Sequence, residues 1–245
     1  MMTAPTVLLL QARVPEDPML DQERRCFAST SGLSEEKLKT HDLCQGPPSL
    51  AEVRRHDAVM VGGAGDYYVS KGNLPHFEGF LDLLRAIVDT RHPMFASCFG
   101  YGCLVQALGG EVIHDPEHTE VGTFELTLTE AGRADELFKA LPDRFWAQMG
   151  RKDRSARHPH DWPALARSAT CPFQGLRVPD APIWASQFHP ELDLDTNLER
   201  YRHYLPSYAR HMSEAEIQKV IDGFCASPQA SSLLRRFIEL VFGSD

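Results

Sequence analysis

Cys98 stands between a short apolar segment and a second apolar stretch with helical character, in the sequence FASCFGYG at residues 95–102. We interpret this pattern as a strand, a tight turn with the cysteine at its tip, and a helix. Small residues such as Ala96, Ser97 and Gly100 let a sharp turn form and leave room beside the sulfur. The following helix directs its N-terminal amides at the thiol, which favours the thiolate. The segment therefore predicts a reactive cysteine, and the alternative is a small buried cysteine that only packs.

A candidate base follows a second strand-like segment, IWASQFHPEL at residues 183–192. His189 and Glu191 stand two apart at its carboxyl end, and residues two apart in an extended chain face the same side. Pro190 between them fixes one backbone dihedral and stiffens the arrangement. With Cys98 they fit a Cys-His-Glu triad, in which the thiolate attacks, His189 carries the proton and Glu191 orients the imidazole. The alternative is a strand-end histidine with a chance acidic neighbour.

A glycine-rich loop follows the apolar strand-like segment 58–61. Glycines there expose backbone N–H groups and allow close approach. We therefore expect the N–H groups of Gly63 and Phe99 to form an oxyanion hole for a tetrahedral intermediate. A phosphate is the alternative ligand, but the loop lacks the lysine and the spacing of a P-loop.

These three segments, in this order, resemble the class I glutamine amidotransferases. That family has its nucleophile in a Gly-x-Cys-x-Gly-x-Gln elbow, an oxyanion strand that ends in Gly-Gly, and its histidine in Gln-Phe-His-Pro-Glu. Cys98, the pair Gly62–Gly63 and residues 187–191 match those motifs, and the resemblance extends over about residues 5–205. Within the family, the chain resembles stand-alone chains similar to the amidotransferase domain of GMP synthase.

The resemblance implies a flavodoxin-like α/β fold and a catalytic triad of Cys98, His189 and Glu191 that needs no cofactor. It implies hydrolysis of glutamine, or of another γ-glutamyl compound, through a cysteine thioester, with the ammonia released to a synthase partner chain. One alternative is a stand-alone γ-glutamyl hydrolase or peptidase. Another is a non-catalytic family member that keeps the fold, against which the complete triad argues.

The resemblance also assigns Gly62, Gly102, Gly150 and Arg151 to substrate binding. Gly102 stands where the family has a glutamine that helps to hold the substrate. Arg151 replaces histidine in residues 149–153, which resemble the Met-Ser-His-Gly-Asp segment of GMP synthase. These departures leave the substrate open between free glutamine and another γ-glutamyl compound. For the basic loop of residues 151–160, we consider a carboxylate substrate, an acidic partner or plain solvation.

Composition disfavours several other classes of protein. The net charge of −9 argues against broad binding to nucleic acid or anionic membranes. No apolar run approaches the roughly 20 residues that a membrane-spanning helix needs, and the apolar start at residues 6–12 lacks a basic leader. Six scattered cysteines without framework spacing indicate reduced thiols and a cytoplasmic protein. Histidines 114, 118, 158 and 160 fit no zinc pattern, so we expect no metal.

Strand-like and helix-like segments alternate along the chain, which predicts a mostly parallel sheet with helices on both faces. A 245-residue chain is long enough to bury a sizeable core in one such domain. We expect strands at residues 6–12, 38–43, 58–61, 124–129, 145–148 and 183–187, and helices at 20–31 and 77–88.

We expect residues 1–208 to form the catalytic domain and residues 209–245 to form a C-terminal helical extension. The extension has a capping-box pattern at Ser213–Glu216 and a second apolar helical stripe over residues 233–241. We expect it to pack on the domain, with a homodimer or partner contact as the alternative. No synthetase domain follows in this sequence, so we expect any ammonia acceptor to be on another chain.

Overall fold

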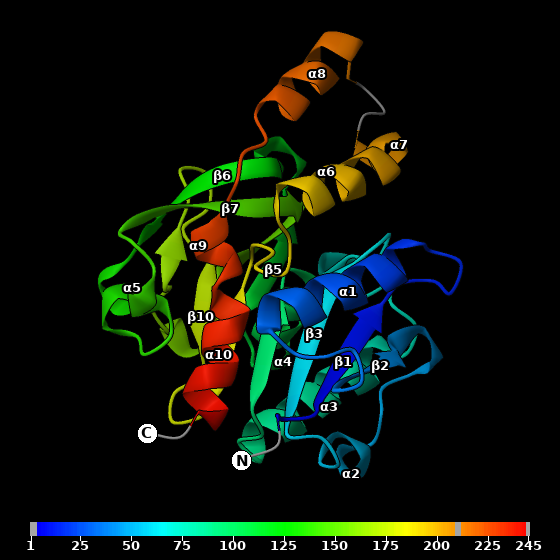
Figure 1. Cartoon of the computed structure of the whole chain (residues 1–245), viewed down its shortest axis with the longest axis vertical. Coiled ribbons are helices and arrows are strands. Elements are labelled where there is room, and N and C mark those ends of the chain that lie inside the picture. The colour runs from blue at the N-terminus through cyan, green and yellow to red at the C-terminus, as the bar shows by residue number, and fades with distance from the viewer. Residues whose placement is uncertain (1–3, 209–211, 244–245) are drawn as a thin grey trace.

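The computed structural model describes residues 4–208 and 212–243, and its centre is a six-stranded sheet (Figure 1). The strand order is β10-β11-β4-β3-β1-β2, and the pairs are parallel except that β10 runs antiparallel to β11. The predicted mostly parallel sheet is therefore confirmed. The strands are β1 Val7–Ala12, β2 Leu38–Asp42, β3 Ala58–Ala64, β4 Met94–Ser97, β10 Gly175–Arg177 and β11 Ile183–Ser186.

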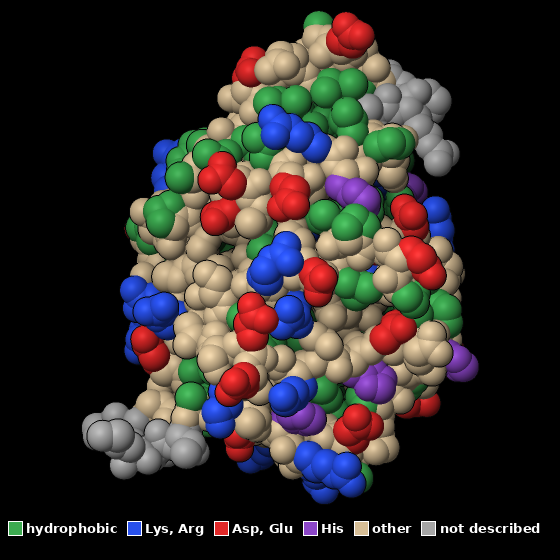
Figure 2. Space-filling model, turned by 45° about the vertical axis from the view of Figure 1, so that its right-hand side comes forward, with side chains coloured by type: hydrophobic (Ala, Val, Ile, Leu, Met, Phe, Trp, Pro, Cys, Tyr) green, Lys and Arg blue, Asp and Glu red, His purple; other side chains and the backbone are tan. Residues whose placement is uncertain are grey.

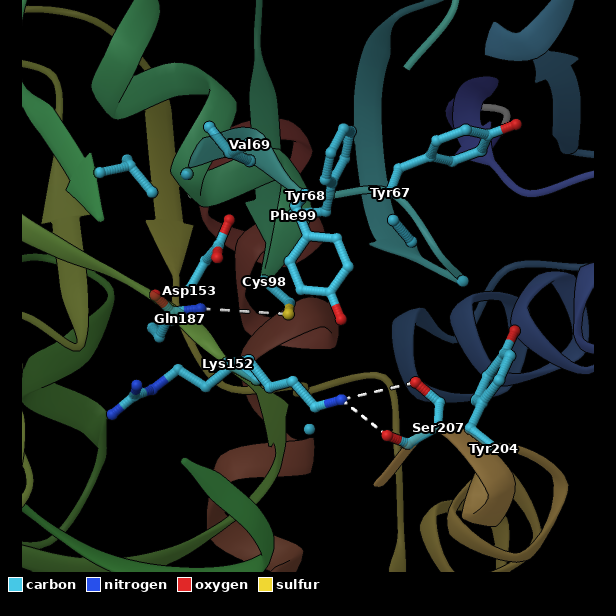
Figure 3. Close-up of a pocket in the computed structure, with 16 residues that line it drawn as sticks. Tyr67, Tyr68, Val69, Cys98, Phe99, Lys152, Asp153, Gln187, Tyr204 and Ser207 are labelled. Carbon is cyan, nitrogen blue, oxygen red and sulfur yellow. Dashed lines mark hydrogen bonds between the residues drawn. The ribbon is translucent and has the colours of Figure 1, made fainter. Parts of the chain in front are cut away.

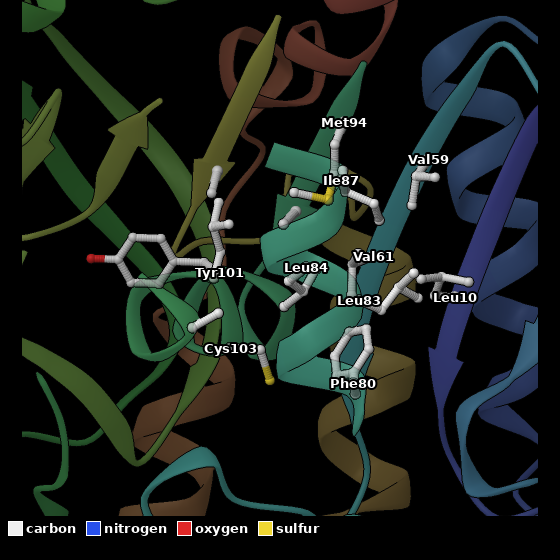
Figure 4. Close-up of a cluster of buried hydrophobic side chains, with 14 of the residues drawn as sticks. Leu10, Val59, Val61, Phe80, Leu83, Leu84, Ile87, Met94, Tyr101 and Cys103 are labelled. Carbon is white, nitrogen blue, oxygen red and sulfur yellow. The ribbon is translucent and has the colours of Figure 1, made fainter. Parts of the chain in front are cut away.

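The sheet separates two hydrophobic layers because successive side chains of a strand point to opposite faces. On one face, Leu10 and Val61 pack with helices α3 (Phe77–Asp89) and α4 (Phe99–Ala107) in a buried cluster (Figure 4). The apolar residues of α3 recur at helical spacing, as the sequence predicts, and six of its thirteen residues are buried.

The opposite face of the sheet is covered by α1 (Met19–Ser31) and α10 (Leu233–Phe242). Leu9 of β1 lies in this second cluster with Phe27 of α1 and Leu233 of α10. Helices therefore cover both faces, as predicted, and each buried leucine or phenylalanine side chain contributes about 1.5–3 kcal/mol to folding.

Two smaller antiparallel sheets lie beside the central one. β5 (Glu111–His114) pairs with β8 (Asp153–Arg157). β6 (Glu120–Leu128) pairs with β7 (Arg144–Arg151) along its whole length and with the short β9 (Ala166–Arg167) at one end. The predicted strands at 124–129 and 145–148 are thus parts of longer ones, because polar residues continue the ladder where the apolar pattern stops.

The remaining helices are short or peripheral. α6 begins with a capping box at Asp193 and runs along the edge of β6 and β7 (Figure 1). These helices are α2 Leu50–Val53, α5 Glu130–Ala134, α6 Leu194–His203, α7 Leu205–Tyr208, α8 Glu214–Asp222 and α9 Pro228–Ser231.

Helices α8 and α10 of the C-terminal segment differ in their packing. The capping box predicted at Ser213–Glu216 begins α8, which projects from the molecule and has no buried residue (Figure 1). Figure 2 shows hydrophobic side chains gathered beneath this projecting end, above a face where acidic and basic side chains alternate. In contrast, α10 contributes Leu233, Leu234 and Phe237 to the core. The domain boundary at residue 208 stays a prediction and adjoins residues 209–211, which are outside the described part.

Several further features bear on the sequence predictions. Each of the six cysteines is a free thiol. Within residues 4–208 and 212–243, no group of three His, Cys, Asp or Glu side chains is arranged to hold a metal. In the same part of the chain, no helix has the length and apolar character to cross a membrane.

Candidate active site

Cys98 lies at the carboxyl end of β4, which is flanked by β11 and β3 in the sheet. Its backbone has φ +50° and ψ −99°, outside the regions that L-residues ordinarily adopt. Two hydrogen bonds hold the turn: Cys98 N–H donates to Ser186 O at 2.8 Å, and Gly102 N–H donates to Cys98 O at 3.0 Å. The sharp turn expected from the sequence is therefore present, with the thiol half-buried at its tip.

Phe99 is the first residue of α4, so its N–H lies in the first turn, where a helix has no acceptor of its own. This places a backbone donor and the positive end of the helix dipole beside the Cys98 sulfur. The geometry is compatible with the oxyanion role predicted for Phe99, which stays a prediction.

Gly100 is needed because α4 begins directly against β3. A Cβ atom on Gly100 would lie 2.6 Å from Val61 Cγ1 and 3.0 Å from Val61 O. We expect Gly100→Ala to lower the free energy of unfolding by about 1–3 kcal/mol, because overpacking outweighs the gain in helix propensity. Urea unfolding measures this change.

Gly79→Ala on α3 is the matched control for this prediction. Its Cβ would meet only Pro47, at an ordinary 3.5 Å, so the variant should gain about 0.5–1 kcal/mol of stability. If the two alanine variants proved equally stable, the close approach of α4 to β3 would not constrain residue 100.

His189 and Glu191 lie in the segment just beyond β11, which ends at Ser186 and pairs with β4. His189 Nδ1 and Glu191 Oε1 are 2.6 Å apart, and both side chains are buried. The imidazole also interacts with the Cys98 sulfur. Because Nδ1 serves the carboxylate, Nε2 is the ring nitrogen left for the sulfur. The three residues of the predicted triad therefore lie together.

The charges of this buried group reinforce one another. Burial favours the neutral imidazole, but the charge of Glu191 and the Cys98 sulfur outweigh it and raise the pKa of His189 to about 9. Burial also favours the neutral carboxyl, but His189 and Arg200 outweigh it and lower the pKa of Glu191 to about 2. At neutral pH, the pair is therefore an imidazolium and a carboxylate.

Arg200 is a second cation in contact with Glu191. Arg200 Nη1 of α6 donates to Glu191 Oε1 at 3.3 Å, and Arg200 Nε donates to Gln22 Oε1 of α1 at 3.0 Å. Our sequence analysis did not identify Arg200 or Gln22, because polar residues on a helix ordinarily indicate a solvent-facing side.

The sequence prediction of a loop directly after residue 61 is wrong: Gly62 and Gly63 lie within β3, because its pairing with β1 continues to Ala64. The two glycines pack closely against the side chains of Glu23 and His189. A Cβ on Gly62 would lie 2.6 Å from Glu23 Oε1, and a Cβ on Gly63 would lie 3.0 Å from His189 Cε1. Gly63 N–H donates to Glu23 Oε1 at 3.2 Å, and Arg13 Nη2 donates to the same oxygen at 3.2 Å. In this structure, the Gly63 N–H thus serves the buried Glu23 carboxylate. Its predicted oxyanion role stays a prediction that requires this hydrogen bond to loosen.

A pocket opens beside Cys98 (Figure 3). Its walls come from the loop after β3, the start of α4, the end of β7 and the segment around α7. Gln187 Nε2 lies 4.0 Å from Cys98 Sγ in this pocket. The lining residues are Ala64, Gly65, Tyr67, Tyr68, Val69, Cys98, Phe99, Gly102, Val112, Gly150, Arg151, Lys152, Asp153, Gln187, Tyr204 and Ser207.

Three of the residues predicted to bind substrate line this pocket, namely Gly102, Gly150 and Arg151. A Cβ on Gly102 would lie 3.0 Å from Val69 Cγ2, so Val69 occupies the space beside this position. Gly62, the fourth residue, contacts Glu23 and does not line the pocket.

Arg151 forms a buried ion pair with Glu120. Its Nε and Nη2 donate to Glu120 Oε2 at 2.9 and 2.6 Å, and both side chains are 1% exposed. Residues 120 and 151 are opposite each other in the β6–β7 ladder. The predicted contact of Arg151 with substrate is untested, and the ion pair leaves only Nη1 and the backbone for it.

The predicted basic loop of residues 151–160 is not a loop: it includes β8, which pairs with β5, and its basic residues do not form one surface. Arg154 Nε donates to Asp115 Oδ2 at 2.5 Å, whereas Arg157 and His160 are exposed. His158 is buried, with Nε2 2.8 Å from the Tyr101 hydroxyl of α4. Burial lowers the pKa of His158 to about 4, so this residue is neutral.

Comparison with known proteins agrees with this fold and identifies the family. Residues 45–202 match the family model of class I glutamine amidotransferases. The chain belongs to the class I glutamine amidotransferase family. It is 30% identical over 161 residues to a glutamine-hydrolyzing GMP synthase of Streptococcus pneumoniae, and the alignment covers 64% of this chain. The aligned part is 28% of that relative, so the chain spans little more than a quarter of its length.

Solved structures share the fold. A glutamine amidotransferase of Thermotoga maritima superposes with a TM-score of 0.72 at 18% identity, covering 99% of this chain and 100% of that one. A glutamine amidotransferase of Methylobacillus flagellatus gives a TM-score of 0.69 at 18% identity, covering 98% of this chain and 93% of that one. At these identities, the likeness concerns the fold alone.

Proposed function

We propose that this chain hydrolyses the side-chain amide of glutamine through a thioester on Cys98 and releases ammonia for a synthase partner. The observation that supports this most directly is the placement of Cys98 beside the buried His189–Glu191 pair, at the ends of two adjacent strands. This is the arrangement that nucleophilic catalysis by cysteine requires.

In the first half-reaction, the Cys98 sulfur attacks the amide carbon and a tetrahedral intermediate forms. Its negative oxygen accepts a hydrogen bond from the Phe99 N–H, at the start of α4, and from Gly63 N–H when that group leaves Glu23. His189 donates its proton to the leaving nitrogen. The C–N bond breaks, ammonia leaves, and the γ-glutamyl group remains as a thioester on Cys98.

In the second half-reaction, water attacks the thioester and His189 takes one proton from it. Collapse of the second intermediate breaks the C–S bond, and glutamate leaves. The sum is glutamine plus water giving glutamate plus ammonia. Glu191 keeps the imidazole oriented through both half-reactions and stabilises its charged form.

Covalent trapping tests this proposal. A diazo-ketone analogue of glutamine should add once to the chain, on Cys98, as measured by intact mass and peptide mapping. Ammonia release from L-glutamine provides the matching turnover measurement. A chain that the analogue leaves unmodified, or modifies at another cysteine, would contradict a glutamine-accepting pocket at Cys98.

A stand-alone γ-glutamyl hydrolase or peptidase is the second candidate function. Gly102 favours it, because the pocket lacks the side-chain amide that the family resemblance assigns to this position. Such an enzyme uses the same thioester but releases an amine or amino acid. Comparing kcat/KM for glutamine and for γ-glutamyl dipeptides distinguishes the two functions.

A further inference from the structure

Three consecutive charged residues line the pocket beside Cys98 where β7 ends and β8 begins: Arg151, Lys152 and Asp153. Arg151 is paired with the buried Glu120. Asp153 accepts hydrogen bonds from Ser70 N–H and Ser70 Oγ, both at 2.9 Å, and its Oδ1 lies 2.9 Å from His114 Nδ1. Arg151 and Asp153 are therefore both held by contacts with other side chains of the protein.

Lys152 instead extends across the pocket to its opposite wall. Its Nζ donates to Ser207 O of α7 at 2.9 Å and lies 3.4 Å from Ser207 Oγ. Figure 3 shows the side chain lying below Cys98, with the ammonium directed at Ser207 near Tyr204. The side chain is partly buried, so its charge acts in a less polar medium than bulk water.

We propose that Lys152 binds the α-carboxylate of the γ-glutamyl substrate and thereby selects it; this assignment rests on the proposed function. With the side-chain amide at the sulfur, the amino-acid end of the substrate occupies the rest of the pocket, where Lys152 lies. A carboxylate is a stronger acceptor for an ammonium than a neutral carbonyl. The substrate carboxylate therefore takes the place of Ser207 at Nζ.

This assignment explains how a pocket with Gly102 can recognise a substrate. Residue 102 offers no side chain to hold the ligand, and Val69 fills the space next to it. Lys152 supplies a charged group from the other side of the pocket. Recognition then depends on a charge-assisted contact, which is stronger and more selective than a neutral one.

Two cysteine reagents separate recognition from reactivity on the full chain. The diazo-ketone analogue of glutamine carries an α-carboxylate, and iodoacetamide does not. We expect K152M to slow labelling of Cys98 by the diazo-ketone about 10- to 100-fold and to leave labelling by iodoacetamide unchanged. K152R keeps the cation and should retain most of the diazo-ketone rate. Lys139→Met, at an exposed position, should retain all of it.

Each other outcome overturns the assignment. An unchanged diazo-ketone rate in K152M means that Lys152 does not contact the carboxylate. Equal slowing of both reagents means that Lys152 only supports the structure. If iodoacetamide labels Cys98 in the wild type and the diazo-ketone does not, the proposed function itself fails, and the assignment fails with it. That pattern differs from failure of Lys152 alone, where the wild type and K152M both react readily with the diazo-ketone.

Discussion

Replacing Cys98 by alanine is expected to abolish amide hydrolysis and to leave the fold intact. In the proposed mechanism the sulfur forms the thioester, so its removal should lower kcat about 10³- to 10⁶-fold. The side chain is small and only half-buried, so circular dichroism should remain that of the wild type. The measurement is ammonia release from glutamine at saturating substrate.

Cys225→Ala is the control for this prediction. Cys225 is also partly exposed and unpaired, and it lies outside the pocket, so its alanine variant should keep full activity. Turnover that survived in Cys98→Ala would exclude the thioester mechanism.

The same position tests whether the protein stores strain at the nucleophile. Cysteine and alanine are both strained by the positive φ of residue 98, whereas glycine adopts it without a steric cost. Cys98→Gly should therefore be about 1–2 kcal/mol more stable to urea than Cys98→Ala. Equal stability of the two variants would show that the turn is relaxed in solution.

The sequence predicts that Cys98, His189 and Glu191 lie close together, as they do in the structure, because the signals for this are local. An apolar run that ends at a cysteine flanked by small residues specifies the turn at Cys98. Two residues in extended spacing specify the contact between His189 and Glu191. That the two segments meet follows from parallel strands, whose carboxyl ends share one edge of the sheet.

The residues around the triad could not be predicted in the same way. Glu23 of α1 accepts a hydrogen bond from Gly63, which is 40 positions away in the sequence, and Arg200 of α6 donates to Glu191. On a helix, a buried carboxylate and an exposed one have the same sequence signature, since periodicity reports which side is apolar and not which polar residue is enclosed. The one available signal for Glu23 is its position next to the apolar stripe of α1.

The ion pair of Arg151 is a second contact that the sequence does not predict. Its partner Glu120 lies directly opposite in the β6–β7 ladder, and strand register decides that contact. The apolar pattern indicated shorter strands, at 124–129 and 145–148, so the register at the polar ends was not available from the sequence. The family resemblance assigns Arg151 to substrate binding, and a resemblance of motifs carries no information about its internal partner Glu120.

Glu191→Gln should produce the second large effect, on both the rate and its pH dependence. Glutamine keeps the size of the side chain and can still accept a hydrogen bond from Nδ1, so the imidazole stays in place. The variant loses the charge that, together with the Cys98 sulfur, overcomes burial and raises the pKa of His189 to about 9. We expect kcat to fall about 10²- to 10⁴-fold.

The pH dependence follows from the sign of that pKa shift. In the proposed mechanism His189 needs its proton for the leaving nitrogen, and without the Glu191 charge it loses the proton at a lower pH. The alkaline limb of the kcat profile should therefore move to lower pH. In the wild type, the stability that protonated His189 contributes is complete below its ordinary value of 6.5 and is lost as pH rises through about 9.

The contribution of Glu191 has the opposite direction. The pKa of Glu191 is lowered to about 2. The stability that ionised Glu191 contributes is therefore complete above the ordinary value of 4.5 and is lost as pH falls through about 2. The difference in unfolding free energy between wild type and Glu191→Gln should thus be largest between pH 4.5 and 6.5 and should shrink toward pH 9. Urea unfolding across this range measures it, with Glu36→Gln, at an exposed position, as the matched control. An alkaline limb that stayed in place, together with a pH-independent stability difference, would mean that Glu191 does not set the charge of His189.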